Sequence, residues 1–318
     1  MRGHALLRQL RCSASTSRRL RYEHGFHAGS YVDVRRAILR NYFERRPLTV
    51  HRSPQVTKHA ILSLLMLRMA EKSRPFTYVD THAGAGSYPL EDSMELSTGL
   101  DRLLAARLDG AALPPALSAF MRAVDACGAA DAYPGSPLVA AALCRDDDAL
   151  LLVEQSETEH AKLVDSLEAV RVPARTICGD GFRALQQKDN LAPQRRALVF
   201  VDPAYQQGAD LERTVKLVEH LERAWHSARV AVWYPVRDTA KVDQLHDALR
   251  ALPRVKEILA AELVRDEDDG GRLPGSGVVL VNPPYGIDAQ LEELLSSLGE
   301  LLSDGAATSS HRVSWVKR

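Results

Sequence analysis

Cysteine, long apolar runs and net charge are all scarce in this sequence. Its 318 residues include four cysteines that never form a C-x-x-C spacing: Cys12, Cys127, Cys144 and Cys178. This scatter gives no zinc-ligand pattern and no disulfide framework, so we expect small buried side chains in a reducing compartment. The longest mostly apolar stretch, residues 60–67, is far shorter than the roughly 20 residues that cross a bilayer. We therefore expect no bound metal and no membrane span.

The formal net charge is zero, which by itself argues against an obligate nucleic-acid binder. The distribution is nevertheless asymmetric. Residues 1–60 carry 13 basic and three acidic side chains, a balance of +10, and the rest of the chain carries 28 basic and 38 acidic ones, a balance of −10. The first 22 residues contain no Asp or Glu and combine Arg with Ser and Thr, which is typical of an organelle transit peptide. We expect a mitochondrial or plastid protein if residues 1–21 act in this way, and a cytoplasmic protein otherwise.

The pattern of apolar residues predicts an α/β fold with a Rossmann-like parallel sheet. From residue 76 onward, short β-branched runs alternate with helical spacing, as in a sheet covered by helices. Seven candidate strands cover residues 76–79, 150–153, 174–178, 197–201, 229–234, 258–264 and 278–281. About seventy residues separate the first two strands, too many for an ordinary crossover. Helical spacing within this interval predicts a small helical subdomain at about residues 91–132.

Polar residues follow the first three predicted strands. Residues 79–86 read V-D-T-H-A-G-A-G, a strand that ends in a glycine-rich turn where backbone can approach a ligand closely. Such a turn is a weak signal alone, because many tight turns look like it. Glu154 ends the second strand, where a carboxylate can accept the hydroxyl hydrogens of a ribose, and Asp180 and Gly181 follow the third. Since doubly wound sheets bind ligands at the carboxyl ends of their strands, this order predicts a nucleoside-type cofactor.

The fourth strand ends in the tetrad D-P-A-Y, residues 202–205. Enzymes of this architecture that methylate amino groups carry [D/N/S]-P-P-[Y/F/W] at this place. Asp202 and the backbone carbonyl of Pro203 would accept the two N–H bonds of an exocyclic amine, freeing its lone pair to attack a sulfonium methyl group. The ring of Tyr205 would stack on a base taken out of its stack. The alternative is a plain strand-end turn.

A second tetrad, N-P-P-Y at residues 282–285, matches the pattern more closely by letter. It follows the seventh predicted strand, however, and not the strand that comes directly after the cofactor-binding carboxylates. We therefore assign catalysis to Asp202 and not to Asn282.

Taken in order, these motifs resemble those of the RlmJ family, the bacterial 23S ribosomal RNA adenine N6 methyltransferases. The resemblance runs from Tyr22 to about Val316. Its motifs are Y-x-H-x-F-H-A-G at residues 22–29, D-T-H-A-G-A-G at 80–86, Y-P-G-S-P at 133–137, Glu154, D-G-F at 180–182, D-P-x-Y at 202–205, W-Y-P-V at 233–236, G-S-G at 275–277, N-P-P at 282–284 and V-S-W at 313–315.

The resemblance implies a class I methyltransferase sheet, S-adenosylmethionine as cofactor and ribosomal RNA as partner, and we expect a monomer. It implies that Asp202 contacts the target N6, with Pro203 and Tyr205 beside it, and that Tyr22 meets the RNA. The implied cofactor contacts are His59, His82, Ser136, Glu154, Asp180 and Gly181.

The chain departs from the family pattern in three places. Ala204 replaces the second proline of the tetrad, residues 1–21 precede the methyltransferase domain at 22–318, and an insertion at residues 35–56 displaces the K-H pair at Lys58. Either this is an organellar homologue or the gene model includes unspliced sequence. Alternative functions are N6-adenine methylation of DNA or another RNA, methylation of a protein glutamine amide, and a non-catalytic RNA-binding role.

Overall fold

The computed structural model describes residues 54–90, 94–127, 132–168, 170–205, 209–265, 275–302 and 309–318. These ranges belong to one structural unit, residues 48–318. The predicted extension at 1–21, the RNA contact Tyr22 and residues 35–53 of the predicted insertion lie outside the described residues.

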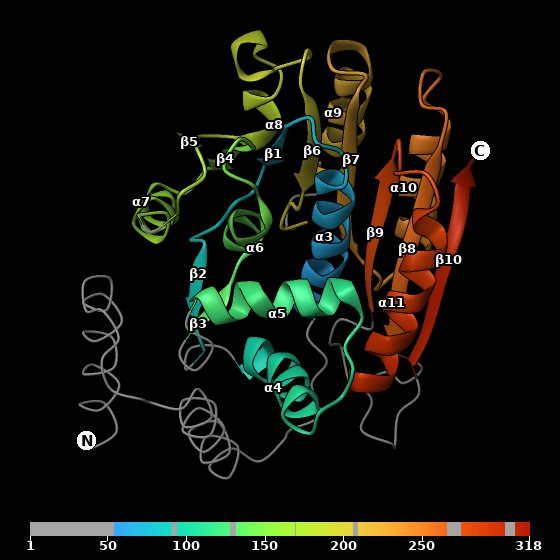
Figure 1. Cartoon of the computed structure of the whole chain (residues 1–318). Helices are drawn as coiled ribbons and strands as arrows, with labels where there is room; N and C mark the ends of the chain where they lie inside the picture. The colour runs from blue at the N-terminus through green and yellow to red at the C-terminus, as the bar shows by residue number, and fades with distance from the viewer. Residues whose placement is uncertain are drawn as a thin grey trace. The chain divides into compact units, whose positions relative to one another are not determined.

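The centre of the structure is an eight-stranded sheet with the order β10-β8-β9-β7-β6-β1-β4-β5 (Figure 1). The strands are β1 (Phe76–Asp80), β4 (Ala149–Glu154), β5 (Ala174–Cys178), β6 (Arg196–Val201), β7 (Ala228–Pro235), β8 (Ile258–Arg265), β9 (Gly275–Val281) and β10 (Ser309–Lys317). Neighbours from β5 to β7 pair in parallel, whereas β9 is antiparallel to both β7 and β8, and β10 is antiparallel to β8. The carboxyl ends of β1, β4, β5, β6 and β7 therefore share one edge of the sheet, and β9 ends at the opposite edge.

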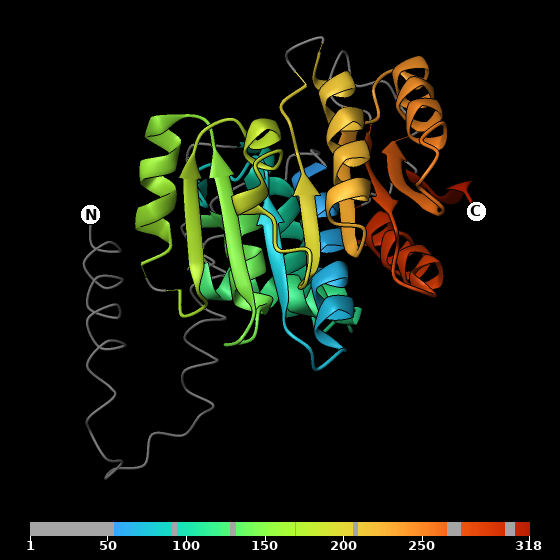
Figure 2. The same cartoon turned by 90° about the horizontal axis from the view of Figure 1, so that it is seen from above.

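Helices cover both faces of this sheet, which explains why its central strands are apolar along their whole length. All residues of β1 and β9 are buried. Helices α3 (Pro54–Ala70), α6 (Ser136–Leu143) and α11 (Ile287–Leu302) pack on one face, and α9 (Asp210–Ala224) and α10 (Thr239–Arg250) pack side by side on the other (Figures 1 and 2). Helix α7 (Glu157–Ser166) packs against β4 and β5.

The seven predicted strands all lie within observed strands, with ends that differ by three residues or fewer. The predicted count of seven is corrected to eight in the main sheet, because β10 was not predicted as a strand. A separate ribbon of β2 (Ser87–Pro89) and β3 (Ala132–Pro134) was also not predicted. The ribbon strands are too short to show periodicity, and β10 is a half-exposed edge strand whose sequence is largely polar.

The segment for which a helical subdomain is predicted contains α4 (Met94–Leu108) and α5 (Pro115–Cys127). Helix α5 packs against α3 and α6, and α4 packs against α11. The short elements α8 (Gly181–Ala184) and η2 (Lys188–Asn190) follow β5. Within the described ranges, no helix has both the length and the apolar character needed to cross a membrane.

Helix α3 begins inside the predicted insertion, so the boundary at residue 56 is corrected. Pro54 occupies its first position, which suits the fixed φ of proline, and Val56 is fully buried. Most of the helix is buried, because α5, α6 and α11 pack around it. The expectation of buried cysteines is wrong for Cys178, which is exposed, while Cys127 and Cys144 are half-buried.

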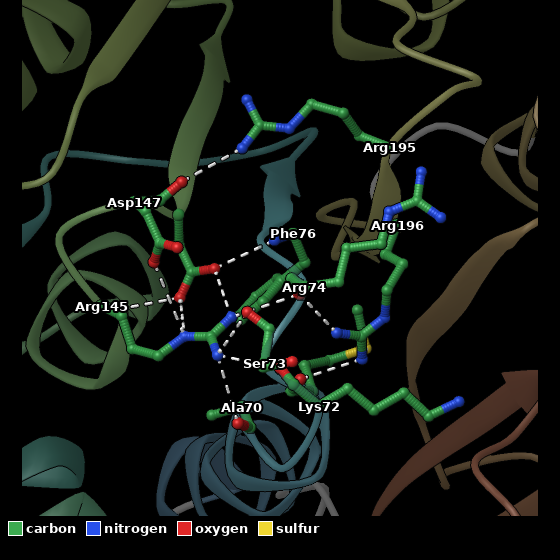
Figure 3. Close-up of polar contacts among 11 residues, drawn as sticks. Ala70, Lys72, Ser73, Arg74, Phe76, Arg145, Asp147, Arg195 and Arg196 are labelled. Carbon is green, nitrogen blue, oxygen red and sulfur yellow. Dashed lines mark hydrogen bonds and ion pairs between the residues drawn. The ribbon is translucent and has the colours of Figure 1, made fainter.

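Arginines from two other segments close the carboxyl end of α3 (Figure 3). Arg196 donates a hydrogen bond of 2.9 Å to the carbonyl oxygen of Met69, and Arg145 donates one of 3.4 Å to that of Ala70. Arg145 also pairs with the buried carboxylate of Asp148 at 2.9 Å. These bonds satisfy carbonyls that a helix end leaves without an intrahelical donor, and the positive charge complements the helix dipole.

Candidate active site

Asp80, at the end of β1, supports the glycine-rich turn from within the core. Its carboxylate accepts hydrogen bonds from the Tyr78 hydroxyl at 2.8 Å and from the backbone N–H of His82 at 3.1 Å. Burial raises the pKa of Asp80 to about 6, and hydrogen bonds from Ser136, Tyr78 and His82 oppose that shift. The fully buried Asp80 thus positions the turn, which passes through Gly84 with a φ of +62°.

Glu154, at the end of β4, contacts the same turn. Its Oε2 accepts a hydrogen bond of 2.8 Å from the backbone N–H of Gly84, and its Oε1 accepts one of 2.8 Å from Ser156. Both oxygens are therefore held in place by backbone donors. Each keeps a further lone pair, so the carboxylate can still accept from a ligand hydroxyl.

Asp180 caps α8 and lies close to the end of β1. Its Oδ1 accepts from the backbone N–H of Phe182 at 3.0 Å, and its Oδ2 pairs with the guanidinium of Arg213 on α9. Burial opposes ionisation, but the hydrogen bond from Arg213 holds the pKa of Asp180 below its usual value. A Cβ on Gly181 would lie 1.9 Å from the carbonyl oxygen of Thr81, so only glycine fits here. The predicted cofactor residues on β4 and β5 therefore lie next to the turn.

Of the two predicted histidines, His59 is buried and His82 is half-buried, and both favour the neutral form. Burial lowers the pKa of His82, and burial together with the charge of Lys58 holds the pKa of His59 well below its usual value. The Thr81 hydroxyl donates its proton to the Phe200 carbonyl at 3.1 Å, so it accepts from Nδ1 of His82 at 2.7 Å. While the hydroxyl donates to Phe200, Nδ1 of His82 carries the ring proton and Nε2 can accept a hydrogen bond.

A pocket of about 360 Å³ brings four of the predicted site residues together. His59, His82, Ser136 and Asp202 line it, and so do Gln55, Lys58, Ala83, Tyr88, Tyr133 and Gly135. The volume lies within the range of small-molecule sites. Glu154, Asp180 and Gly181 do not line it, but Glu154 and Gly181 lie against the adjoining turn. Among the described side chains, no group of three or more His, Cys, Asp or Glu could hold a metal ion.

Lys58 is a site residue to which our sequence analysis gave no role. Its Nζ donates a hydrogen bond of 2.5 Å to Oδ2 of Asp202, and the two side chains are 6% and 13% exposed. The ammonium also lies 5.2 Å from the centroid of the Trp233 ring. Lys58 and Asp202 are 144 positions apart, so only the fold reveals the pair. In the sequence, Lys58 is marked only by its position next to His59, which is a predicted site residue.

The last residues of the D-P-A-Y tetrad face a second pocket, of about 520 Å³. Ala204 and Tyr205 line it together with Trp233, Arg237 and Lys241, among others, whereas Asp202 lines the first pocket. Tyr205 has a φ of +52°, and its hydroxyl donates to the carbonyl oxygen of Trp233 at 2.7 Å. Pro203 is buried. The tetrad thus forms a partition between two pockets.

The N-P-P-Y tetrad lies at the opposite edge of the sheet. Because β9 runs antiparallel to β7, Asn282 follows the sheet at the end where β7 begins, and its Nδ2 donates to the Ala228 carbonyl at 3.1 Å. The two tetrads therefore lie at opposite edges of the sheet, a separation that arises because β9 runs antiparallel to β7.

Comparison with known proteins agrees with this arrangement. Residues 73–317 match the family model described as "Ribosomal RNA large subunit methyltransferase D, RlmJ". The chain belongs to this family. It is 31% identical over 309 residues to Ribosomal RNA large subunit methyltransferase J of Escherichia coli and 30% identical over 305 residues to that of Haemophilus influenzae. Each alignment covers 93% of this chain and 99% of the relative.

A crystal structure from Legionella pneumophila has the same fold as this family member. It aligns with a TM-score of 0.75 and 25% sequence identity, covering 84% of this chain and 98% of the other.

Proposed function

We propose that this protein transfers a methyl group from S-adenosylmethionine to the exocyclic N6 of an adenine in large-subunit ribosomal RNA. The observation that carries the proposal is the position of Asp202. It follows β6, lies beside the glycine-rich turn that follows β1, and lines the pocket shared by His59, His82 and Ser136. Membership of a family of ribosomal RNA large subunit methyltransferases supports the substrate class.

The residues of the first pocket and of the adjoining turn fit the proposed cofactor. Glu154 has acceptor capacity for ribose hydroxyls, the glycine turn lets the chain approach a ligand, and the neutral Nε2 of His82 can accept a hydrogen bond. When bound, S-adenosylmethionine supplies an electrophilic methyl group on a sulfonium. Asp180 is held by Arg213 and by backbone donors, so its contribution is limited to the lone pairs that remain.

The tetrad explains how a weak nucleophile becomes reactive. The nitrogen lone pair of an adenine amino group is delocalised into the ring. A carboxylate and a carbonyl that accept its N–H bonds favour a pyramidal nitrogen and aim the lone pair at the methyl group. Lys58 orients the Asp202 carboxylate through Oδ2, which leaves Oδ1 for the amine.

We propose that the adenine enters from the second pocket. Tyr205 and Trp233 give this pocket aromatic walls, and Arg237 and Lys241 give it cations that suit the phosphates of an RNA strand. The hydroxyl bond from Tyr205 to Trp233 fixes the plane of the tyrosine ring before the base arrives.

The experiment that tests the function is methyl transfer to a transcribed fragment of large-subunit ribosomal RNA, with nucleosides identified by mass spectrometry. Wild-type protein should form N6-methyladenosine. Asp202→Ala should lower the rate by about 10²-fold or more, since it removes a positioned electrostatic contact. It should leave cofactor affinity measured by calorimetry nearly unchanged.

Two further variants separate the roles of the carboxylates. Glu154→Gln should weaken cofactor binding by about 1.5 to 3 kcal/mol, the loss expected for a charge-assisted hydrogen bond. Asp243→Ala, at an exposed position of α10, controls for the loss of a carboxylate and should change neither quantity. An active Asp202→Ala enzyme would refute the assignment of that residue.

We also propose that residues 1–21 direct the protein to a mitochondrion or plastid and that the enzyme acts as a monomer. The support for targeting is composition alone: Arg, Ser and Thr without an acidic residue. A fluorescent protein fused to residues 1–21 should enter an organelle, whereas one that stays in the cytoplasm would refute the proposal.

A further inference from the structure

The N-P-P-Y tetrad has no part in the proposed reaction, yet it presents an unusually exposed aromatic side chain. Tyr285 is 96% exposed, and Val164 is the other exposed large hydrophobic residue among the described ones. Tyr285 lies at the edge of the sheet opposite Asp202, because β9 is antiparallel to β7. An exposed tyrosine ring leaves apolar surface in water, and a partner that covered the ring would remove that surface.

The turn that carries Tyr285 is held rigidly. Asn282 adopts a φ of +58°, its backbone N–H donates to the Glu257 carbonyl at 3.1 Å, and its side-chain amide donates to Ala228. Arg68 of α3 donates a hydrogen bond of 2.8 Å to the carbonyl oxygen of Tyr285 itself. The ring is thus presented to solvent on a fixed backbone, which lowers the entropy lost when something binds to it.

Arginines gather beside this turn. Arg196 and Arg229 approach the Met69 sulfur at 3.8 and 3.9 Å, and Arg68 precedes Met69 on α3. Burial lowers the pKa of Arg229, and the charge of Arg68 lowers it further. Burial likewise lowers the pKa of Arg196, with a contribution from Arg229. Each guanidinium therefore raises the cost of ionising the next, and an anion would relieve this repulsion.

The described carboxylates do not neutralise this cluster fully. Arg68 pairs with Glu71, but within the described part of the chain Arg196 and Arg229 bond only to carbonyl oxygens and the thioether. Figure 3 shows Arg196 directed to the backbone near Arg74. The Nε atoms of Arg68 and Arg229 are buried without a hydrogen-bond partner. We call Tyr285, Arg68, Arg196 and Arg229 the Tyr285 patch.

The geometry points to a second RNA contact: we propose that the Tyr285 patch binds a single-stranded RNA segment, with a base stacked on Tyr285 and phosphates against the guanidinium groups. An aromatic ring beside clustered arginines is the pattern that binds single strands without reading their sequence. The cluster lies on a part of the chain, residues 61–318, whose overall charge balance is −10. The class of nucleic acid, RNA, rests on the proposed function.

A second RNA contact away from the first pocket is useful because several carboxylates lie near that pocket. Asp202, Glu154 and Asp180 lie around the first pocket, and such carboxylates repel a phosphate backbone. Arg237 and Lys241 of the second pocket can contact phosphates only near the target adenine, so contacts to the rest of a long RNA must come from cations placed elsewhere.

The test uses the full-length protein and a fluorescein-labelled 15-nucleotide oligouridine, which contains no target adenine. Tyr285→Ala should weaken binding by about 5- to 100-fold, the usual effect of losing one stacked base. Tyr285→Phe should bind like wild type. Arg229→Gln should lower the slope of log affinity against log salt by about 0.7, as expected for one phosphate contact to a single strand. Val164→Ala, the matched exposed position on α7, should change nothing.

The outcomes distinguish this proposal from the proposed function. If Tyr285→Ala binds oligouridine as tightly as wild type, the Tyr285 patch is not an RNA site, whatever the methylation assay shows. If wild type methylates no ribosomal RNA but its binding of oligouridine depends on Tyr285, the proposed function fails and the patch stands. The Tyr285→Ala variant should retain wild-type cofactor affinity, since Tyr285 supports nothing in the core.

Discussion

Asp80 both supports the glycine-rich turn and places an ionisable carboxylate in the core. It holds the turn that the cofactor would contact, yet its carboxylate is fully buried. Burial disfavours the charged form of a carboxylate, so ionisation of Asp80 lowers the stability of the fold next to the ligand site.

This cost predicts a specific dependence of stability on pH. Burial raises the pKa of Asp80 from 3.8 to about 6, so the folded state binds a proton more tightly than the unfolded state. The contribution of Asp80 to stability is therefore fully present below pH 4 and is lost as the pH rises through 6. The shift corresponds to at most about 3 kcal/mol.

Asp80→Asn removes the titration. The unfolding free energy of the variant relative to wild type should increase between pH 4 and pH 7, as measured by urea denaturation at each pH. Asp165→Asn, an exposed position on α7, controls for the lost charge. Parallel pH profiles for wild type and Asp80→Asn would contradict the predicted shift.

The sequence predicts the residues that end strands better than those that face them across the fold. Glu154, Asp180 and Asp202 each follow a recognisable strand, so their common edge follows from the parallel order. Lys58 and Arg213 lie on helices, where a charged residue usually faces solvent. Their pairing with Asp202 and Asp180 depends on how α3 and α9 pack, which periodicity does not determine.

Among the helices and strands, the sequence predicts the buried elements better than the exposed ones. The strands of the central sheet are continuous apolar runs, so they are found within three residues of their true ends. Strand β10, at the edge of the sheet, begins with four polar residues, and the last of them, Arg312, bonds to the buried Glu262. Because of these polar residues, β10 has no apolar run from which a strand could be predicted. The start of α3 is predicted wrongly from the sequence, because Pro54 is interpreted there as a helix breaker. Proline breaks a helix when it lies in the helix interior, but it fits the first turn, where Pro54 lies.

The closure of α3 by arginines gives a prediction at this scale. Arg145→Ala leaves Asp148 without its ion pair, although the carboxylate still accepts from the backbone of Phe76. Since Arg145 is about one-third exposed, we expect a loss of about 2 to 3 kcal/mol in unfolding free energy, below the cost of breaking a fully buried pair. Lys162→Ala breaks the exposed pair with Glu159 and should cost less than about 0.5 kcal/mol. Equal effects in urea denaturation would show that the closure of α3 adds little.

For the whole molecule, a deletion tests what the predicted insertion at residues 35–56 contributes. Its last three predicted residues belong to α3, so the segment that can be removed is 35–53, joining Val34 to Pro54. This deletion removes six arginines and one glutamate. We expect cofactor binding to survive, because Lys58 and His59 stay on α3, and RNA affinity to fall with a shallower salt dependence.

Calorimetry with the cofactor and RNA binding at several salt concentrations measure both effects. Loss of cofactor binding on deletion would mean that the segment is an integral part of the fold. An unchanged salt dependence would mean that its arginines make no phosphate contacts.

The partition formed by the D-P-A-Y tetrad has a consequence for the design of inhibitors. Asp202 faces one pocket and Tyr205 the other, so a compound that joined an adenosyl group to an adenine would have to place its linker beside Asp202. A cationic linker would compete with Lys58 for that carboxylate, whereas a neutral linker that donates a hydrogen bond to Oδ1 could leave the pair intact. The affinity of such a molecule would depend on how well the linker length matches the distance between the two pockets, as well as on the contacts of its two ends.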